Sequence, residues 1–226
     1  MNSLIKPRES RKIQAIIFDM DGVLIDAKEW HYEALNRALN LFGLEITRKL
    51  HLQEFDGLPT KTKLEMISAT KSLPRTLHSF INAMKQIYTI EAIDLHCVPS
   101  PTRINALKSL KNDGFRLALC SNSIAKTIEL MLEKSALREY LDFYLSNESV
   151  ANPKPNPEIY KKAIVRLNLS PHEVLIVEDN QNGITAAKQS GAFVMEIGDI
   201  AEVNYENIKR VIAECESKKG NKNAKI

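Results

Sequence analysis

Short, almost uninterrupted apolar runs recur along the chain, and each is followed by polar residues. These runs cover Ile13–Phe18, Phe115–Cys120, Val174–Val177 and Phe193–Ile197, with a shorter candidate at Asp142–Leu145. Runs of this length without polar alternation are typical of strands that are covered on both faces, as in a parallel sheet. The pattern therefore predicts a sheet of up to five parallel strands.

Segments with the apolar period of an amphipathic helix alternate with these runs. They cover Thr102–Asn112, Ile124–Lys134, Glu158–Leu167 and Ile184–Ser190, the last of which starts near Gln181. Capping signals agree with these bounds: Asn156-Pro157-Glu158 suits a helix start, Ser170 and Glu173 have capping-box spacing, and Gly191 suits a left-handed helix end. Strands that alternate with helices predict a layered α/β fold with right-handed crossovers.

Residues 27–95 interrupt this alternation. Three segments there have helical patterns, at Glu29–Phe42, Thr60–Thr70 and Arg75–Ile93, and no convincing strand lies between them. This stretch is too long for an ordinary α/β crossover. We interpret residues 27–95 as an inserted all-helical domain and residues 1–26 with 96–226 as a discontinuous core, joined near residues 25–28 and 95–100.

Composition places the chain among ordinary globular proteins, with 44% hydrophobic and 26% charged residues. Collagen-like, low-complexity and largely disordered classes are excluded. Three widely separated cysteines, without a CxxC pair, indicate neither a disulfide framework nor a zinc site and favour a reduced, cytoplasmic setting. No apolar run approaches the roughly 20 residues of a membrane span, and the N-terminus lacks the apolar region of a signal peptide.

The formal net charge of +3 lies at the ends of the chain. Residues 1–14 carry +3 and residues 213–226 carry +2, which leaves −2 for the body of the protein. We interpret both basic ends as frayed and solvated rather than as a polyanion site. The expected partner is a small molecule, not nucleic acid or membrane, and the expected state is a monomer or weak homodimer.

Polar residues that suit phosphate chemistry follow the predicted strands. Asp19-Met20-Asp21-Gly22 follows the first, Ser121-Asn122-Ser123 the second and Glu178-Asp179-Asn180 the fourth, and Lys154 lies in the proline-flanked loop 152–157. Since the carboxyl ends of parallel strands share one edge of a sheet, these side chains are expected at one rim. Crowded carboxylates repel each other unless a cation joins them, and hard oxygen ligands suit Mg²⁺.

The same residues divide naturally between two tasks. A phosphate dianion at this rim would be balanced by the metal, by Lys154 and by a helix N-terminus predicted to start at Ser123. Asp19 and Asp21 stand two residues apart, and Gly22 permits a sharp turn after them. One of the two carboxylates can act as nucleophile and the other can transfer protons.

Phe18-Asp19-Met20-Asp21-Gly22-Val23-Leu24, with Ser121, Lys154 and Val177-Glu178-Asp179-Asn180 in that order, resembles the haloacid dehalogenase (HAD) superfamily. The similarity runs from about Ile13 to about Ile197 and is greatest to the branch of phosphatases and β-phosphoglucomutase-like enzymes. The resemblance implies a Rossmann-like parallel sheet core, with residues 27–95 as a helical cap that closes over the substrate.

The resemblance also implies a role for each motif residue. Asp19 would attack phosphorus to form an aspartyl-phosphate, while Asp21 would protonate the leaving oxygen and later deprotonate water. Ser121 would hydrogen-bond a phosphoryl oxygen, and Lys154 would stabilise the negative charges. Mg²⁺ would be held by the Asp19 carboxylate, the Asp21 carbonyl and Asp179, with Glu178 either as a ligand or just behind the ligands.

Four neighbouring residues have more than one interpretation. His31 lies where relatives often carry a histidine near the active site, and it either joins the site or packs near the hinge. Ser123 either caps a helix or joins the site. Cys120 is expected to pack at the end of a buried strand rather than act as a nucleophile, and Trp30 to pack between the two domains rather than stack on substrate.

Motif variants within the superfamily discriminate among reactions. Asp21 argues against carbon–halogen cleavage and phosphonatase chemistry, which go with other residues at that position. Mutases of this branch carry a lysine just before the cap-loop glycine and an arginine three residues after it. Here Asp56 and Thr60 flank Gly57 at those positions, with Lys61 next to Thr60, so phosphatase is favoured over mutase.

We expect the cap loop to set specificity. Asp56, Gly57, Thr60 and Lys61, together with His31 and Asn122, are the predicted substrate-binding residues. Their mix of charges and hydroxyls suits a small polar phosphate ester such as a sugar phosphate. The third alternative is a non-catalytic binding protein of the same fold. That alternative would be expected to lack at least one of Asp19, Asp21, Lys154 and Asp179, and all four are present.

Overall fold

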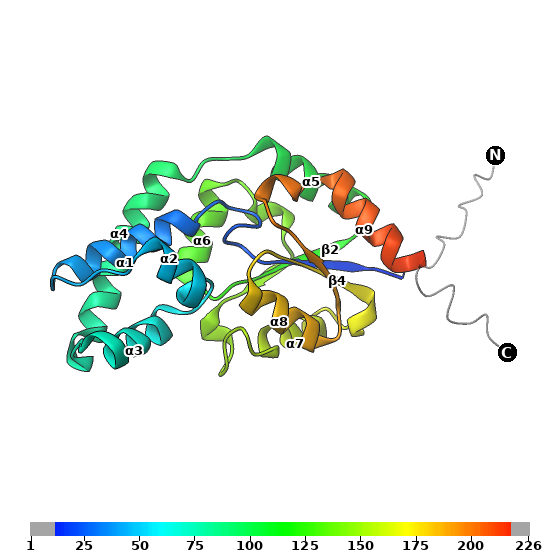
Figure 1. Cartoon of the computed structure of the whole chain (residues 1–226). Coiled ribbons are helices and arrows are strands. Elements are labelled where there is room, and N and C mark those ends of the chain that lie inside the picture. The colour runs from blue at the N-terminus through cyan, green and yellow to red at the C-terminus, as the bar shows by residue number, and fades with distance from the viewer. Residues whose placement is uncertain (1–11, 218–226) are drawn as a thin grey trace, which may run out of the picture.

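Five parallel strands form one sheet at the centre of the computed structural model, which describes residues 12–217 (Figure 1). The strands are β1 (Ala15–Phe18), β2 (Arg116–Cys120), β3 (Phe143–Leu145), β4 (Val174–Glu178) and β5 (Phe193–Glu196), and their order is β3-β2-β1-β4-β5. The predicted parallel sheet is therefore confirmed, with small shifts at the strand ends.

The order of the strands determines where a ligand can bind. From β1 the chain first adds β2 and β3 on one side, and then β4 and β5 on the other. In the middle of β1, Ile17 pairs in register with Ala118 of β2 and with Ile176 of β4. Connections leave β1 and β4 in opposite directions, so a crevice forms at the carboxyl ends of these two strands. Asp19 follows β1 there, and Glu178 ends β4.

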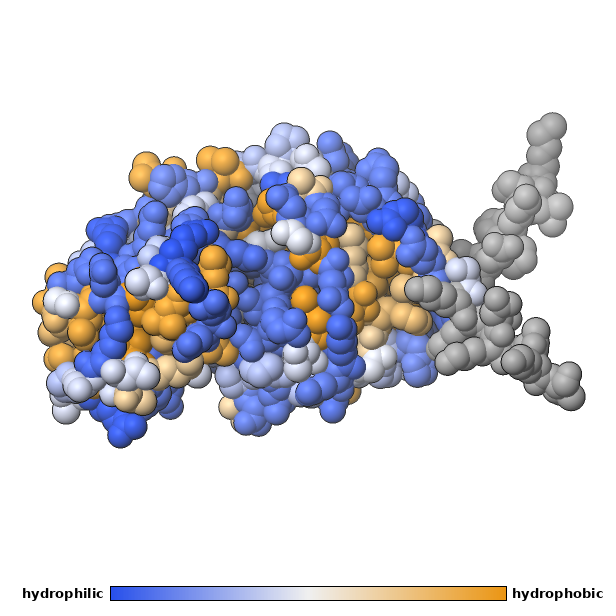
Figure 2. All heavy atoms as spheres, in the orientation of Figure 1, coloured by the Kyte–Doolittle hydropathy of each residue, from blue (hydrophilic) through white to orange (hydrophobic). Residues whose placement is uncertain are grey.

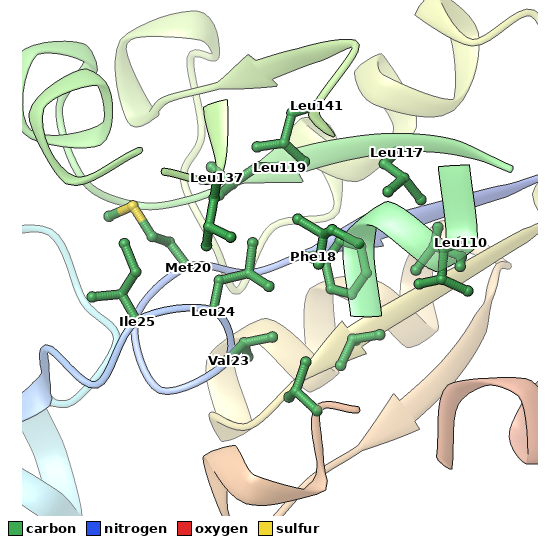
Figure 3. Close-up of a cluster of buried hydrophobic side chains, with 14 of the residues drawn as sticks. Phe18, Met20, Val23, Leu24, Ile25, Leu110, Leu117, Leu119, Leu137 and Leu141 are labelled. Carbon is green, nitrogen blue, oxygen red and sulfur yellow. The ribbon is translucent and has the colours of Figure 1, made fainter. Parts of the chain in front are cut away.

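Alternate strand residues face opposite layers of helices. Phe18, Leu119 and Val177 belong to a cluster with helices α5 (Pro101–Asn112), α6 (Ala125–Lys134) and α9 (Tyr205–Ser217), part of which Figure 3 shows. Ile17 and Ile176 face α7 (Glu158–Arg166) and α8 (Gln181–Ser190) on the other side. Both faces of the sheet are covered, which explains the uninterrupted apolar runs.

The predicted insertion is helical and has a hydrophobic cluster of its own. Its helices are α1 (Lys28–Asn40), α2 (Arg48–Leu50), α3 (Thr60–Lys71) and α4 (His78–His96), with a π-helical turn at His51–Phe55 and a 3-10 turn at Arg75–Leu77. Leu35, Leu64 and Ile81 are buried together between these helices. The residue-level boundaries of the domains stay a prediction; α4 ends one residue beyond the expected limit at 95.

Predicted helix ends have the expected local structure. Gly191 ends α8 in a left-handed conformation, with φ of 85°. Ser170 and Glu173 form a capping box around a 3-10 turn, and the Asn156 side chain accepts the Glu158 backbone N–H at 3.0 Å. The remaining 3-10 turns cover Arg138–Tyr140, Asn147–Ser149 and Ile200–Glu202.

The C-terminal helix α9 corrects the interpretation of the chain ends. Ile208 and Ile212 of α9 are buried against the sheet, and the Glu216 carboxylate accepts the backbone N–H groups of Lys12 and Ile13, each at 3.2 Å. The prediction of frayed ends is therefore wrong for residues 12–14 and 213–217. Residues 1–11 and 218–226 lie outside the described residues. Apolar residues at 208, 211, 212 and 215 carried the helical period that would have predicted α9.

Hydrophilic residues cover much of the face in Figure 2, and hydrophobic side chains appear there in patches, including one over the cap helices. Within residues 12–217, no helix combines the length and the apolar character that a membrane crossing requires.

Burial in the sheet predicts how much one leucine contributes to stability. Leu119 is fully buried, whereas Leu95 on α4 is 74% exposed. We expect Leu119→Ala to lower the free energy of unfolding by about 2–5 kcal/mol, because it leaves a cavity in a packed core. Urea titration measures this free energy in both variants. In the control Leu95→Ala it should stay within about 0.5 kcal/mol of the wild-type value. Equal losses in the two variants would contradict the packing described.

Candidate active site

A tight turn after β1 places the two aspartates. The Asp19 backbone N–H extends the ladder to the Val177 carbonyl at 3.0 Å, and the Gly22 N–H donates to the Ile25 carbonyl at 2.7 Å. Gly22 has φ of 85°, and a Cβ atom at this position would overlap the Asp179 carboxylate. Glycine is required both for the conformation and for the close approach of the β1 and β4 loops.

Lys154 is a buried centre of hydrogen bonding. Its ammonium group donates to Asp19 Oδ1 at 2.6 Å, to Glu178 Oε1 at 2.7 Å and to the Cys120 carbonyl at 2.8 Å. Burial alone would lower the pKa of Lys154, but the two carboxylates raise that pKa well above its usual value. Lys154 therefore carries its charge at neutral pH and holds the ends of β1, β2 and β4 together.

Asn122 positions the loop that carries Lys154. Its side-chain oxygen accepts the Lys154 backbone N–H at 3.1 Å, and its side-chain nitrogen donates to the Lys154 carbonyl at 3.2 Å. The same nitrogen donates to the Gly57 carbonyl of the cap at 2.8 Å. Predicted to bind substrate, Asn122 is engaged here with the protein itself.

Tyr160 on α7 is a site residue that the sequence analysis missed. Its hydroxyl donates to Glu178 Oε1, and its ring lies 4.7 Å from the Lys154 ammonium group. Burial raises the pKa of Tyr160 well above its usual value, so the hydroxyl keeps its proton. The helical period over Glu158–Leu167 gave no sign of this polar contact.

Asp19, Glu178 and Asp179 form the expected cluster, with one oxygen of each lying within 4.8 Å of the others. Burial raises the pKa of Asp19 well above its usual value and that of Asp179 to about 6, and nearby carboxylates act in the same direction. Lys154 and Lys28 oppose these shifts, Lys28 through an ion pair with Asp179. Like Tyr160, Lys28 was not predicted.

This cluster fits a divalent cation. Asp179 Oδ1 is buried and accepts no hydrogen bond within residues 12–217. Buried carboxylate oxygens without donors are costly, and three repelling carboxylates gain most from a hard, doubly charged ion. The donor set suits Mg²⁺.

Asp21 belongs to a separate hydrogen-bonded chain. Ser123 Oγ donates to Asp21 Oδ2 at 3.2 Å, and His31 Nε2 lies 3.1 Å from Asp21 Oδ1. The ionised Asp21 carboxylate can only accept, so the neutral His31 ring carries its proton on Nε2, and its Nδ1 accepts from the Lys85 side-chain nitrogen 3.2 Å away.

The pKa values in this chain follow from burial and charge. Burial would raise the pKa of Asp21, but His31, Lys85 and Ser123 lower that pKa below its ordinary value. Burial lowers the pKa of His31, with Asp21 opposing the shift. At neutral pH the arrangement therefore holds an ionised Asp21 beside a neutral His31.

These contacts decide the open alternatives. His31 joins the site rather than only packing near the hinge. Ser123 bonds Asp21 and does not cap α6, which begins at Ala125 without a side-chain cap, two residues after the predicted start. Ser121 is buried, and its Oγ accepts the Ser123 backbone N–H at 3.0 Å.

Two residues pack as predicted. Burial raises the pKa of Cys120 to about 12, so its thiol stays neutral in the core. Trp30 packs against the sheet cluster, and its ring lies 6.0 Å from that of His96, between the cap and the core.

A cavity of about 420 Å³ joins the two domains. Nearly all of the predicted site residues line it: Asp19, Asp21, His31, Asp56, Gly57, Thr60, Lys61, Ser121, Asn122, Lys154 and Glu178. Asp179 is the predicted residue outside this lining. The structure thus brings most of the motif residues of the core and the cap-loop residues to one cavity.

Comparison with known proteins identifies the family of the chain. Residues 16–197 match the family model described as haloacid dehalogenase-like hydrolase. The chain belongs to this family. The predicted HAD membership and the sheet core with its inserted helical cap are both confirmed, and the chain is an enzyme of the hydrolase class that the family comprises.

Individual relatives of this HAD enzyme are phosphatases and mutases. A phosphorylated carbohydrates phosphatase of Thermotoga maritima is 29% identical over 219 residues, which cover 89% of this chain and 99% of the relative. A β-phosphoglucomutase of Bacillus subtilis is 25% identical, covering 82% and 84%. The crystal structure of β-phosphoglucomutase from Clostridium difficile shares the fold, with a TM-score of 0.78 at 23% identity, covering 89% of this chain and 98% of that one.

The cap loop of this HAD enzyme is hydrogen-bonded to the core. Asn180 Nδ2 donates to Asp56 Oδ2 at 2.8 Å, and Asn182 Nδ2 donates to the Asp56 carbonyl at 3.0 Å. Gly57 has φ of 71°, and a Cβ atom there would overlap the Asn180 side chain. The structure therefore represents a closed arrangement in which Asp56 contacts the core.

The hydroxyl of Tyr160 should contribute measurably to stability. Tyr160→Phe removes the donor to the buried Glu178 carboxylate. We expect the metal-free variant to lose about 1–3 kcal/mol of unfolding free energy, because a buried charged acceptor loses a hydrogen bond. Tyr144→Phe, which removes an exposed hydrogen bond to Glu129, is the matched control and should change little. A Tyr160→Phe variant as stable as this control would show that the contact is unimportant.

His51 should make stability depend on pH. The residue is buried, and burial together with Lys63 lowers its pKa to about 4 from 6.5. Between pH 6.5 and 4 the unfolded chain binds a proton at His51 that the folded protein does not, so stability falls as pH falls through this window. His51→Gln should reduce that fall in urea titrations at pH 7.5, 6 and 5. His172→Gln, at an exposed position, is the control. If the free energy of unfolding of His51→Gln depended on pH as steeply as that of the wild type, the lowered pKa of His51 would be contradicted.

Proposed function

We propose that this HAD enzyme is a Mg²⁺-dependent phosphatase that hydrolyses small phosphate monoesters through an aspartyl-phosphate on Asp19. The observation that carries the proposal is the pair of carboxylates held in different ways in one cavity: Asp19 by Lys154, and Asp21 by His31 and Ser123. One carboxylate is fixed as a nucleophile, and the other has a hydrogen-bonded chain of its own for proton transfer.

In the first step an oxygen of Asp19 attacks phosphorus. A bond forms between that oxygen and phosphorus, the ester P–O bond breaks, and Asp21 gives a proton to the leaving alcohol. Lys154 keeps Asp19 in place through the 2.6 Å hydrogen bond and offsets the charge of the phosphoryl group. Since Asp21 is ionised in this arrangement, its donor role requires a proton gained as substrate binds.

In the second step water releases the phosphate. Asp21 takes a proton from the water, the water oxygen bonds to phosphorus, and the bond between phosphorus and Asp19 breaks. The lowered pKa of Asp21 keeps it ionised for this role, and the His31 N–H orients it. The products are inorganic phosphate and a regenerated Asp19.

The residues that would hold Mg²⁺ are Asp19, Asp179, the backbone carbonyl of Asp21 and Glu178. When bound, the ion would supply positive charge against the phosphoryl oxygens. Glu178 already accepts hydrogen bonds from Lys154 and Tyr160, which suits a position just behind the ligands better than a direct one.

Sugar phosphates are the proposed substrate class, supported by the phosphorylated carbohydrates phosphatase among the relatives. Mutase activity is the alternative that the β-phosphoglucomutase relative supports. Against it, Asp56 stands where mutases carry lysine, and its carboxylate is bonded to Asn180 rather than available to a ligand. We further propose a cytoplasmic monomer or weak homodimer without nucleic-acid or membrane partners, in keeping with the buried thiols of Cys97 and Cys120, which form no disulfide.

Turnover of p-nitrophenyl phosphate tests the proposal. Wild type should release phosphate with Mg²⁺ and lose activity when the metal is chelated. Asp19→Asn should fall to background, and Asp21→Asn should fall by about 10²–10⁴ because it loses the proton-transferring group. The exposed neighbour Asp26→Asn is the control and should keep wild-type rates.

Two outcomes would contradict this function. The first is activity that persists in Asp19→Asn. The second is conversion of glucose monophosphate to its isomer without release of inorganic phosphate, which would instead establish the mutase.

A further inference from the structure

Lys28 covers Asp179, one of the proposed metal ligands. Its ammonium group forms an ion pair with Asp179 Oδ2, and the side chain of Asp179 is 3% exposed whereas that of Lys28 is 34% exposed. Lys28 lines the active-site cavity, but Asp179 does not. The ammonium group of Lys28 therefore separates the cavity from a carboxylate that the proposed Mg²⁺ would share with Asp19.

Packing on Gly22 fixes the position of Lys28. A Cβ atom on Gly22 would overlap both the Asp179 carboxylate and the Lys28 side chain at Cε. The aliphatic part of Lys28 and the Asp179 carboxylate therefore lie together on the face that this glycine leaves open. The contact directs the ammonium group to Asp179 rather than into solvent.

Local helix preferences do not explain a lysine at this position. Lys28 is the first residue of α1, after Ala27, and no side chain caps the first N–H groups there. The positive end of the helix dipole disfavours a cation in the first turn. Burial would lower the pKa of this lysine, but carboxylates of the site raise that pKa. They are Asp179, Asp56 and Asp19. The charge of Lys28 is therefore held in place by the site itself.

A lysine at this place opposes the binding of a second cation. Oδ2 of Asp179 contacts Lys28, and Oδ1 accepts no hydrogen bond within the described part of the chain. An ion bound through Oδ2 would take the place of the ammonium group. An ion bound through Oδ1 would share one carboxylate with it, and like charges at so short a distance repel. In both cases the charge of Lys28 weakens metal binding.

We propose that Lys28 competes with Mg²⁺ for Asp179 and thereby sets the metal affinity of the enzyme. The ammonium group balances part of the carboxylate cluster until the ion binds, and it then leaves Asp179. The inference rests on the proposed Mg²⁺-dependent phosphatase and adds a control of its metal site. Because Lys28 begins α1, the exchange also breaks an ion pair between the cap and the core.

Calorimetric titration with Mg²⁺ alone measures this competition. Lys28→Met keeps an unbranched chain over Gly22 but removes the charge. It should bind Mg²⁺ about 10-fold more tightly than the wild type, as expected for the loss of one charge contact. Lys28→Arg keeps the charge and should bind Mg²⁺ as weakly as the wild type. The matched control is Lys61→Met, which removes an exposed cation from the same cavity and should change the affinity by no more than about twofold.

Thermal unfolding separates competition from a merely structural ion pair. With a chelator present, Lys28→Met should have a lower Tm than the wild type, because the buried Asp179 carboxylate loses its counter-cation. The same concentration of Mg²⁺ should then raise the Tm of Lys28→Met by more than that of the wild type, because tighter binding adds more stability. A deficit in Tm that is equal with and without Mg²⁺ would show that the pair only stabilises the fold, and would overturn the proposal.

Failure of this inference differs from failure of the proposed function. If Lys28→Met binds Mg²⁺ no more tightly than the wild type, the competition is overturned, while Mg²⁺-dependent hydrolysis of p-nitrophenyl phosphate would leave the phosphatase standing. Tightening of equal size in Lys61→Met or Lys28→Arg also overturns it. If Lys28→Met binds Mg²⁺ more tightly but no ester is hydrolysed, the competition holds and the phosphatase fails. Absence of Mg²⁺ binding in both the wild type and Lys28→Met overturns the inference whatever the activity.

Discussion

The buried ammonium group of Lys154 is the interaction on which this active site depends. It lies between Asp19 and Glu178, and its third hydrogen bond goes to the backbone at the end of β2. Burial and the neighbouring carboxylates raise the pKa of Asp19, and the charge of Lys154 opposes them, so it favours the ionised form that a nucleophile needs. The surrounding residues serve this contact: Asn122 holds the backbone of Lys154, and Tyr160 gives Glu178 a further donor. The sheet supplies the geometry, because β1 and β4 are adjacent strands whose connections diverge.

The cavity combines two different electrostatic environments. Its core side carries the carboxylates that would share a metal ion, and its cap side carries Lys63 and Lys85 beside the neutral His31. Asp21 lies where these environments meet, since it is in the core but is hydrogen-bonded to His31 of the cap. Orientation of Asp21, the proposed proton-transferring carboxylate, therefore depends on the position of α1. A movement of α1 that withdrew His31 would remove this hydrogen bond.

Much of the fold and of the core motifs could be predicted from the sequence, because the signals are local. Uninterrupted apolar runs marked the strands, and the residues directly after them, such as Asp19 and Ser121, lie in one cavity. Residues whose role depends on where a helix face points were not predicted. Tyr160 and Lys85 both occupy buried helical positions, and periodicity gives no information on which polar group meets the end of a buried side chain. Asp56 was assigned to substrate specificity from its place in the cap loop, but its hydrogen bonds to Asn180 and Asn182 depend on how two domains meet.

The Asn180 side chain has a consequence for the cost of bringing the two domains together. Its oxygen accepts the backbone N–H of Asn182 at the start of α8, and this bond lies entirely within the core. The amide plane is therefore set by the core alone, with its nitrogen directed to where the Asp56 carboxylate docks. When the cap closes on the core, the Asn180 side chain therefore loses little conformational freedom. Most of the conformational entropy cost falls on the cap loop around Gly57. Because the Asn180 side chain is already fixed, its hydrogen bond to Asp56 can form and break quickly. An enzyme that admits a new substrate in every cycle requires such a contact.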